Sequence, residues 1–341
     1  MVRETSQAEV VLAANHIKTY NTIAYAATEP APVALDASAT ANCYVVARAG
    51  RYEFDATTMG NGAVTPPDAA YTAGSTCGKA DGIVPEALRP VTAKLLWQTA
   101  PNLIGEVSLG EEGRIRFTTA DPFVEGNAVV AACDADGAIL WSWHLWLTSA
   151  DLEGSLHRYA LPYEGLGAAA VMDRNLGALA AAWLGADNAS SYGMFYQWGR
   201  KDPFMPARSA YHADTDSNNI PAYNETNYEV GNGSGSWIFN ATTLPLTTPP
   251  GNIPNAIQNP MTYLQPYYSD HYNWYCASKD EKVTHSGLWG PEKTIFDPCP
   301  VGYKVPGSNL WGIPSGNTSL RNGGPVEDLS LIHISEPTRP I

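Results

Sequence analysis

The sequence predicts two domains, an all-β sandwich followed by a mixed α+β domain. Three observations lead to this prediction. The chain has 341 residues, which is enough for two domains. Charged residues make up only 16% of it, while Gly (30) and Pro (26) are plentiful, as is typical of turn-rich β proteins. Short β-type runs without helical periodicity fill the first half, and a helix-type spacing of aromatic residues appears only after residue 190.

The first half has about seven short runs rich in β-branched and aromatic residues, which is the pattern of a β-sandwich. Residues 42–48 and 51–55 flank Ala49-Gly50, and this arrangement predicts a hairpin. The alternation in residues 114–119 directs Ile115 and Phe117 inward. The remaining strands are expected at 93–98, 104–109, 128–133 and 138–147, with a hairpin turn of the Asp-Gly kind at 134–137.

The strand at 138–147 has two apolar faces. One face is predicted to be core, and it carries Ile139, Trp141, Trp143, Leu145 and Leu147. The other face carries His144 and Trp146, which we expect to lie against the second domain.

A short helix is predicted where Tyr192, Phe195 and Tyr196 recur at the spacing of one helical face. Gly199 is expected to end this helix, with Arg200 and Lys201 facing the negative end of its dipole. A second helix is expected at residues 178–183, which are rich in alanine. Core anchoring is the simpler role for the three rings, and ligand stacking is the alternative.

Three motifs follow one another in the second half. They are Met-Asp-Arg-Asn-Leu-Gly-Ala at 172–178, Tyr-Gly-Met-Phe-Tyr-Gln-Trp-Gly at 192–199 and Asp-Pro-Cys-Pro-Val-Gly-Tyr-Lys-Val-Pro at 297–306. In this order they resemble the Fibrobacter-type major paralogous domain (FISUMP) family. The resemblance implies a C-type-lectin-like fold in secreted or surface-anchored proteins, many from Bacteroidetes, and it implies no catalytic residues. The motif positions are Asp173, Arg174, Asn175, Tyr192, Tyr196, Trp198, Asp297 and Cys299.

Asp173, Arg174 and Asn175 are interpreted as a structural polar cluster, in which Arg174 pairs with Asp173 or with Asp297. Two runs of the first half, at 42–46 and 139–146, also resemble Bacteroidetes surface proteins that couple a sandwich to such a domain. Some of those proteins accompany fimbrillin-like adhesins.

The expected organisation has four parts. Residues 1–40 are a linker or the end of an upstream region, 41–150 the sandwich, 168–328 a truncated C-type-lectin-like domain, and 329–341 a tail that resembles translated sequencing adapter. On this interpretation the chain is a fragment, and an export signal and lipoprotein anchor would lie upstream of it. The resemblance then implies an extracellular or outer-membrane surface location.

The formal net charge of −14 argues against nucleic acid and anionic membranes as partners. No apolar run approaches the roughly 20 residues of a membrane span, so no transmembrane segment is expected. The expected partners are a glycan or a surface-protein ligand, with pilin subunits as a further possibility. A structural module of a surface appendage is the alternative function, and a secreted glycan-acting enzyme a weaker one.

The long loop region at 206–275 is the predicted recognition surface. Flat aromatic rings suit the faces of pyranose sugars. Core and loop-pinning roles are the alternative, and they are the simpler interpretation of these aromatic residues. The predicted ligand-binding residues are Trp237, Tyr267, Tyr268, Tyr272 and Trp274, with Tyr223 and Tyr228 in the same region.

One stretch has the spacing of a calcium loop, with oxygen ligands at positions 1, 3, 5 and 12. These positions hold Asp214, Asp216, Asn218 and Glu225. Asn219 stands where glycine belongs, so the pattern favours a solvated turn, with calcium as the alternative. No other cofactor is expected, and the sequence lacks the nucleophile-elbow and zinc-protease motifs that would predict catalysis.

The five cysteines are Cys43, Cys77, Cys133, Cys276 and Cys299. None forms a Cys-x-x-Cys pair, so a zinc ribbon or thioredoxin-type motif is not predicted. A disulfide between Cys276 and Cys299 is one hypothesis, and buried thiols that pack as small apolar groups are the other.

Overall fold

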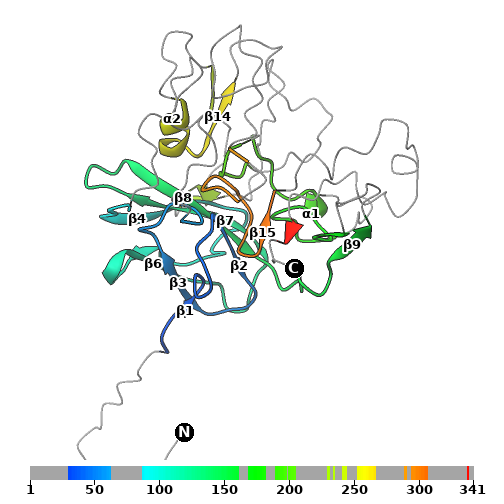
Figure 1. Cartoon of the computed structure of the whole chain (residues 1–341). Coiled ribbons are helices and arrows are strands. Elements are labelled where there is room, and N and C mark those ends of the chain that lie inside the picture. Colours follow the sequence, from blue (N-terminus) through cyan, green and yellow to red (C-terminus); the bar gives the residue numbers. More distant parts are fainter. Residues whose placement is uncertain are drawn as a thin grey trace, which may run out of the picture. The chain divides into compact units, whose positions relative to one another are not determined.

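The computed structural model describes residues 30–62, 87–160, 168–181, 189–197, 199–204, 229–230, 233–234, 240–243, 252–265, 288–289, 293–305 and 336–337. The chain divides into two compact units, Met1–Ala31 and Pro32–Ile341, and all strands and helices named below lie in the second. The described residues are mostly β-sheet with very little helix (Figure 1), which confirms the β-rich prediction.

The larger sheet has six strands in the order β12-β11-β4-β7-β8-β2. Its neighbouring strands are antiparallel except β2, which runs parallel to β8. The bounds are β12 Gly233–Ser234, β11 Glu229–Val230, β4 Thr92–Gln98, β7 Gly126–Cys133, β8 Ile139–Leu147 and β2 Cys43–Val46. The predicted turn between β7 and β8 is confirmed, because Asp134 and Ala138 close it by a backbone hydrogen bond and Gly137 has φ +83°.

The smaller sheet has the order β1-β3-β6-β5, with only β1 and β3 parallel. Its strands are β1 Val33–Ala34, β3 Arg51–Asp55, β6 Arg114–Thr118 and β5 Ser108–Leu109. The alternation predicted for β6 is confirmed, since Ile115 and Phe117 are buried. Of the strand predicted at 104–109, only Ser108–Leu109 forms, and Ile104 makes an isolated bridge to Thr119.

The predicted hairpin at 42–55 is wrong. β2 pairs with β8 and β3 pairs with β6, so the two runs belong to different sheets. The carbonyl of Gly50 accepts a hydrogen bond from the N–H of Thr119, beyond the end of β6, so the expected turn continues the smaller sheet. The physical reason is burial: β2 is almost entirely buried and needs the apolar β8 beside it, whereas β3 alternates between buried and exposed positions.

The remaining elements are short. They are the pairs β9 (His157–Ala160) with β10 (Ala168–Val171), β13 (Asn240–Thr243) with β14 (Thr262–Gln265) and β15 (Tyr303–Lys304) with β16 (Glu336–Pro337), a 3₁₀ turn at Glu111–Gly113, and helices α1 (Ala189–Tyr192) and α2 (Asn252–Gln258). Neither helix of the described part has the length and apolar character that crossing a membrane requires.

The two sheets share one hydrophobic core. Phe54 of β3 contacts Tyr44 of β2 and Trp143 of β8, with ring centroids 4.7 and 5.3 Å apart. Rings of this size each contribute roughly 1.5–3 kcal/mol when they leave water. Helix α2 joins the same core through Ile253 and Ala256.

The larger sheet is also buried on its second face. Leu96, Trp97 and Val129 on that face pack with Met194 and Phe204 from the second half of the chain. All eight positions of β7 are buried, and this explains its run of small apolar residues, because a strand covered on both faces does not alternate.

The strand β8 confirms most of its predicted pattern. Trp141, Trp143, Leu145 and Leu147 lie in the shared core, and His144 and Trp146 face the second half of the chain. The prediction for Ile139 is wrong. A register shift pairs Ala132 with Trp141 but Cys133 with Ile139, and this bulge places Ile139 in the cluster on the opposite face.

The predicted helix through Tyr196 is also wrong. Helix α1 ends at Tyr192, and Gly193 then takes φ +66°. Phe195 instead exchanges two backbone hydrogen bonds with Phe204, at 2.8 and 2.7 Å, so the local helical spacing gives way to a non-local pairing. The described residues of the predicted helix at 178–183, namely 178–181, are likewise not helical.

Candidate functional site

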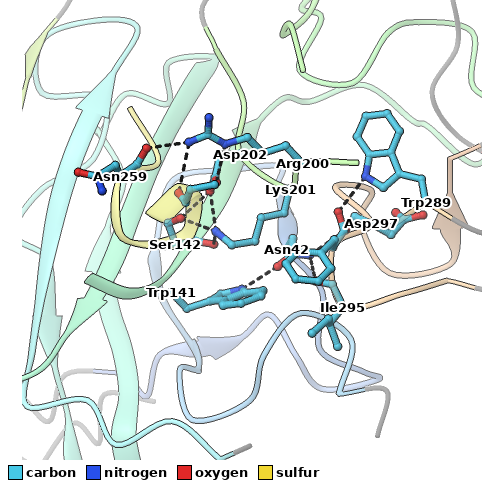
Figure 2. A network of polar contacts seen from close by, with 12 residues as sticks. Asn42, Trp141, Ser142, Arg200, Lys201, Asp202, Asn259, Trp289, Ile295 and Asp297 are labelled. Carbon is cyan, nitrogen blue, oxygen red and sulfur yellow. Dashed lines mark hydrogen bonds and ion pairs between the residues drawn. The ribbon is translucent and has the colours of Figure 1, made fainter. Parts of the chain in front are cut away.

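A buried polar network joins the larger sheet to the second half of the chain (Figure 2). Its members are Asn42, Ser142, Arg200, Lys201, Asp202 and Asp297, and none of them is more than 3% exposed. Charged groups are rarely buried this deeply unless they are paired. The network is therefore the feature of the described residues that most needs explanation.

Lys201 and Asp202 form its centre. The Lys201 Nζ lies 2.5 Å from Asp202 Oδ1 and 2.5 Å from Ser142 Oγ, and it donates to the Ser142 carbonyl at 3.2 Å. It also lies over the Trp141 ring, 4.6 Å from the centroid (Figure 2). Burial lowers the pKa of Lys201, and the Asp202 carboxylate opposes this. The expectation that Arg200 and Lys201 face the negative end of a helix ending at Gly199 is thus wrong, because α1 already ends at Tyr192.

A serine hydroxyl beside a lysine amine is also the arrangement of a nucleophile and its base. Two observations favour a structural role here. The Ser142 hydroxyl donates to Asp202 Oδ1 at 2.6 Å, and the Lys201 side chain is only 1% exposed. The reactive group of a substrate could approach the Ser142 hydroxyl only if these buried contacts were first broken. We therefore assign this cluster to holding residues 200–204 against β8.

Arg200 connects the network to α2. Its Nη2 donates to the carbonyls of Asn259, at 2.7 Å, and Ala256, at 3.3 Å. Its Nη1 donates to Gln197 Oε1 at 2.8 Å, and its guanidinium lies 4.9 Å from the Phe204 ring centroid. A cation beside the last carbonyls of a helix is favourable. This arrangement fastens α2 to the sheet.

Asn42 connects the network to the segment that leads into the Asp-Pro-Cys-Pro motif at 297–300. Its Nδ2 donates to the carbonyls of Ile295, at 2.6 Å, and Asp297, at 2.8 Å, while its Oδ1 accepts from Trp141 Nε1 at 2.8 Å. One side chain just before β2 thus holds β8 and residues 295–297 together, as Figure 2 shows.

Asp297 closes the Asp-Pro-Cys-Pro motif on itself. Its Oδ1 accepts from the N–H of Cys299 and its Oδ2 from the N–H of Val305, both at 2.8 Å. Lys293 supports the same turn by donating to the carbonyls of Cys299, Pro300 and Tyr303 at 2.6–2.9 Å. Two prolines in the motif remove backbone donors, so side chains fix its shape instead.

His144 forms a second polar contact across the same interface. Asn127 Nδ2 donates to the Gly177 carbonyl at 2.9 Å, so its Oδ1 is left to accept from His144 Nε2 at 2.8 Å. His144 Nδ1 then accepts from the Tyr196 hydroxyl at 3.3 Å. Burial lowers the pKa of His144 to about 3, which keeps the ring neutral.

A hollow of about 280 Å³ lies between β2, residues 150–153 and residues 300–303. The exposed Asp151 and Glu153 and the half-buried Tyr303 contribute to its lining. Asp151 also caps the turn that follows, because its Oδ1 accepts from the N–H of Gly154 at 2.9 Å. The carboxylates can accept hydrogen bonds from a hydroxyl-rich ligand, and the tyrosine ring can stack against it.

The motif residues predicted from the sequence meet in the structure as far as they are described. Arg174 pairs with Asp173 through Nε–Oδ1 at 2.7 Å and Nη2–Oδ2 at 2.9 Å. Of its two expected partners, Asp173 and Asp297, it therefore binds Asp173. Met172 and Leu176 share a buried cluster with Cys299 and Val305. The side chain of Tyr192 and the whole of Trp198 lie outside the described residues.

The predicted ligand-binding and calcium residues lie outside the described residues as well. They are Trp237, Tyr267, Tyr268, Tyr272, Trp274, Asp214, Asp216, Asn218 and Glu225, and their roles stay predictions. Among the residues that the structure does describe, no three His, Cys, Asp or Glu side chains group as metal ligands would.

Sequence reasoning missed Asn42, Ser142, Lys201 and Asp202. A signal was present for Ser142, which interrupts the apolar run of β8 on the face assigned to the domain contact. Asn42 and Lys201 carried no local signal, because their partners lie far away in the sequence.

Models of protein families, curated proteins and solved structures were all compared with the chain, and none matches it.

Proposed function

We propose that the chain is a cell-surface or fimbria-associated binding protein that recognises a glycan or a surface-protein ligand through its 206–275 loops. The resemblance to the FISUMP family and its C-type-lectin-like fold motivates this proposal. The observation that carries it is the fastening of those loops to a rigid sheet, which is how binding loops are usually displayed.

The fastening to the sheet has two points, and a third contact pairs two segments of the loop region with each other. Glu229 and Val230 of β11 pair with Gln98 and Trp97 of β4. Helix α2 packs into the shared core and is held by Arg200. Strands β13 and β14 pair with each other in parallel and so bring residues 240–243 beside 262–265 (Figure 1). Loops tied at both ends lose less entropy on binding, which favours affinity.

The test is retention of the full chain on a glycan array and on immobilised pilin subunits. We expect retention on at least one of them, reduced about tenfold or more by Trp237→Ala or Trp274→Ala, because loss of one aromatic anchor costs 1–2 kcal/mol or more. Val91→Ala, at an exposed position outside the loops, is the matched control and should bind normally.

Tyr303→Ala distinguishes the hollow from the loops. If this variant alone loses retention, the hollow is the binding surface and the 206–275 loops are not. Retention on neither array would overturn the proposed function. Stable incorporation into an appendage without ligand retention would instead favour the structural module.

A further inference from the structure

Cys43 and Cys299 are two buried cysteines that pack in the same hydrophobic cluster. Both side chains are fully buried, at 0% exposure, and both belong to one cluster with Trp146, Leu152 and Met172. Cys43 is on β2 and Cys299 is in the Asp-Pro-Cys-Pro motif, so the two are remote in the sequence.

The backbone brings these two cysteines close together. Cys43 forms an isolated parallel bridge with Pro300, the residue next to Cys299. Cys299 is one residue from this bridge, where regular strand geometry gives a Cα separation of about 6 Å from Cys43. Both thiols are free in this structure, and both side chains enter the same buried cluster. Disulfides span Cα separations of about 4.4–6.8 Å.

The surrounding contacts hold this geometry in place. Lys293 donates to the carbonyls of Cys299 and Pro300 at 2.7 and 2.9 Å. Asn42, which precedes Cys43, is bonded to the carbonyls of Ile295 and Asp297. Asn42 therefore anchors the Cys43 end of β2 to the other segment, and Lys293 fixes the turn that carries Cys299.

We infer that Cys43 and Cys299 form a disulfide that ties β2 to the Asp-Pro-Cys-Pro motif when the chain folds in an oxidising compartment. In the reaction each cysteine loses its thiol hydrogen, one S–S bond forms, and one molecule of a small disulfide such as glutathione disulfide is reduced to two thiols. Its occurrence in the organism rests on the proposed surface location, whereas the chemistry itself does not.

The bond has to form before the core closes. Burial raises the pKa of both thiols, and the nearby Lys293 ammonium opposes this only in part. The thiolate is the attacking species, so the folded and reduced chain exchanges slowly. This inference also competes with the predicted Cys276–Cys299 pair, since Cys299 can join only one of them.

Peptide mapping decides between the pairings. The full chain is refolded with reduced and oxidised glutathione, its free thiols are blocked with N-ethylmaleimide, and it is cut with trypsin. Trypsin cleavage places each cysteine in a different peptide. Residues 19–48 hold Cys43, 52–79 Cys77, 117–158 Cys133, 209–279 Cys276 and 294–304 Cys299. We expect peptide 19–48 linked to peptide 294–304, with the link lost on reduction.

Two variants sharpen the test. Cys43→Ala should abolish the link and lower the thermal midpoint by about 5–10 °C relative to the oxidised wild-type chain. Cys133→Ala, another buried cysteine, should keep the link. Peptide 294–304 linked to 209–279, or both thiols blocked in wild-type chain that has a native circular dichroism spectrum, would overturn the inference. Ligand retention does not enter this readout, so its failure and that of the proposed function can be told apart.

Discussion

Single polar side chains determine how the second half of this protein meets its sheet. Asn42 makes three buried hydrogen bonds and His144 makes two, and all their partners lie on other elements or loops. A buried donor or acceptor that loses its partner costs about 1–3 kcal/mol. These residues therefore stabilise one specific arrangement of the segments more than they add to the hydrophobic core.

His144 makes stability depend on pH in a defined direction. Burial lowers its pKa to about 3 in the folded chain, below the ordinary value of 6.5. Above pH 6.5 the ring is neutral in both the folded and the unfolded states, so its contribution to stability is fully present there. As the pH falls, only the unfolded state takes up the proton, and stability is lost down to about pH 3.

We predict that His144→Gln removes this part of the acid sensitivity. Between pH 6 and 4 the free energy of unfolding of the wild type should fall by up to about 1.4 kcal/mol per pH unit more than that of the variant. Urea unfolding at several pH values measures both slopes. Parallel curves for the two chains would contradict a buried neutral histidine.

At the scale of elements, local signals predicted what local contacts determine. The Asp-Gly turn at 134–137 was predicted because its hydrogen bonds lie within the turn itself. The hairpin at 42–55 failed because its two strands bond to partners far away in the sequence. The helix through Tyr196 failed because Phe195 bonds to Phe204, beyond the reach of a helical hydrogen bond. Ile139 failed because a bulge in the register leaves no trace in the alternation.

Asp297 and Asp134 offer a matched pair of turn aspartates. Each accepts two backbone N–H groups, but Asp297 is 2% exposed whereas Asp134 lies in an exposed hairpin. We predict that Asp297→Ala lowers the free energy of unfolding by about 2–4 kcal/mol, and that Asp134→Ala lowers it by about 1 kcal/mol or less. The reason is that water replaces the lost acceptor only at the exposed turn.

Equilibrium urea unfolding of both variants checks this prediction. Equal losses would mean that the Asp-Pro-Cys-Pro motif opens to solvent as readily as the hairpin does. Such a result would argue against a rigid anchor for the neighbouring segments.

At the scale of the whole molecule, the sequence predicted the β-rich fold, the inward residues of β6 and the face of β8 that meets the second half of the chain. It also predicted that Arg174 pairs with Asp173 or Asp297. Beyond β8, it did not predict that the larger sheet is buried on its second face, because that burial depends on distant residues such as Met194 and Phe204. Residues such as Asn42 and Lys201 acquire their roles only in that arrangement, so no local pattern reveals them.

The central claim is that the larger sheet and the described residues 199–204 and 293–305 form one cooperative unit, which also holds β11 and α2. Hydrogen exchange of the wild-type chain and Asn42→Ala, followed in peptides covering 139–147 and 294–305, tests it most directly. We predict that the variant lowers the protection of both peptides by the same factor, about 30- to 150-fold for a loss of 2–3 kcal/mol. Loss of protection in 294–305 alone, with β8 unchanged, would contradict the claim.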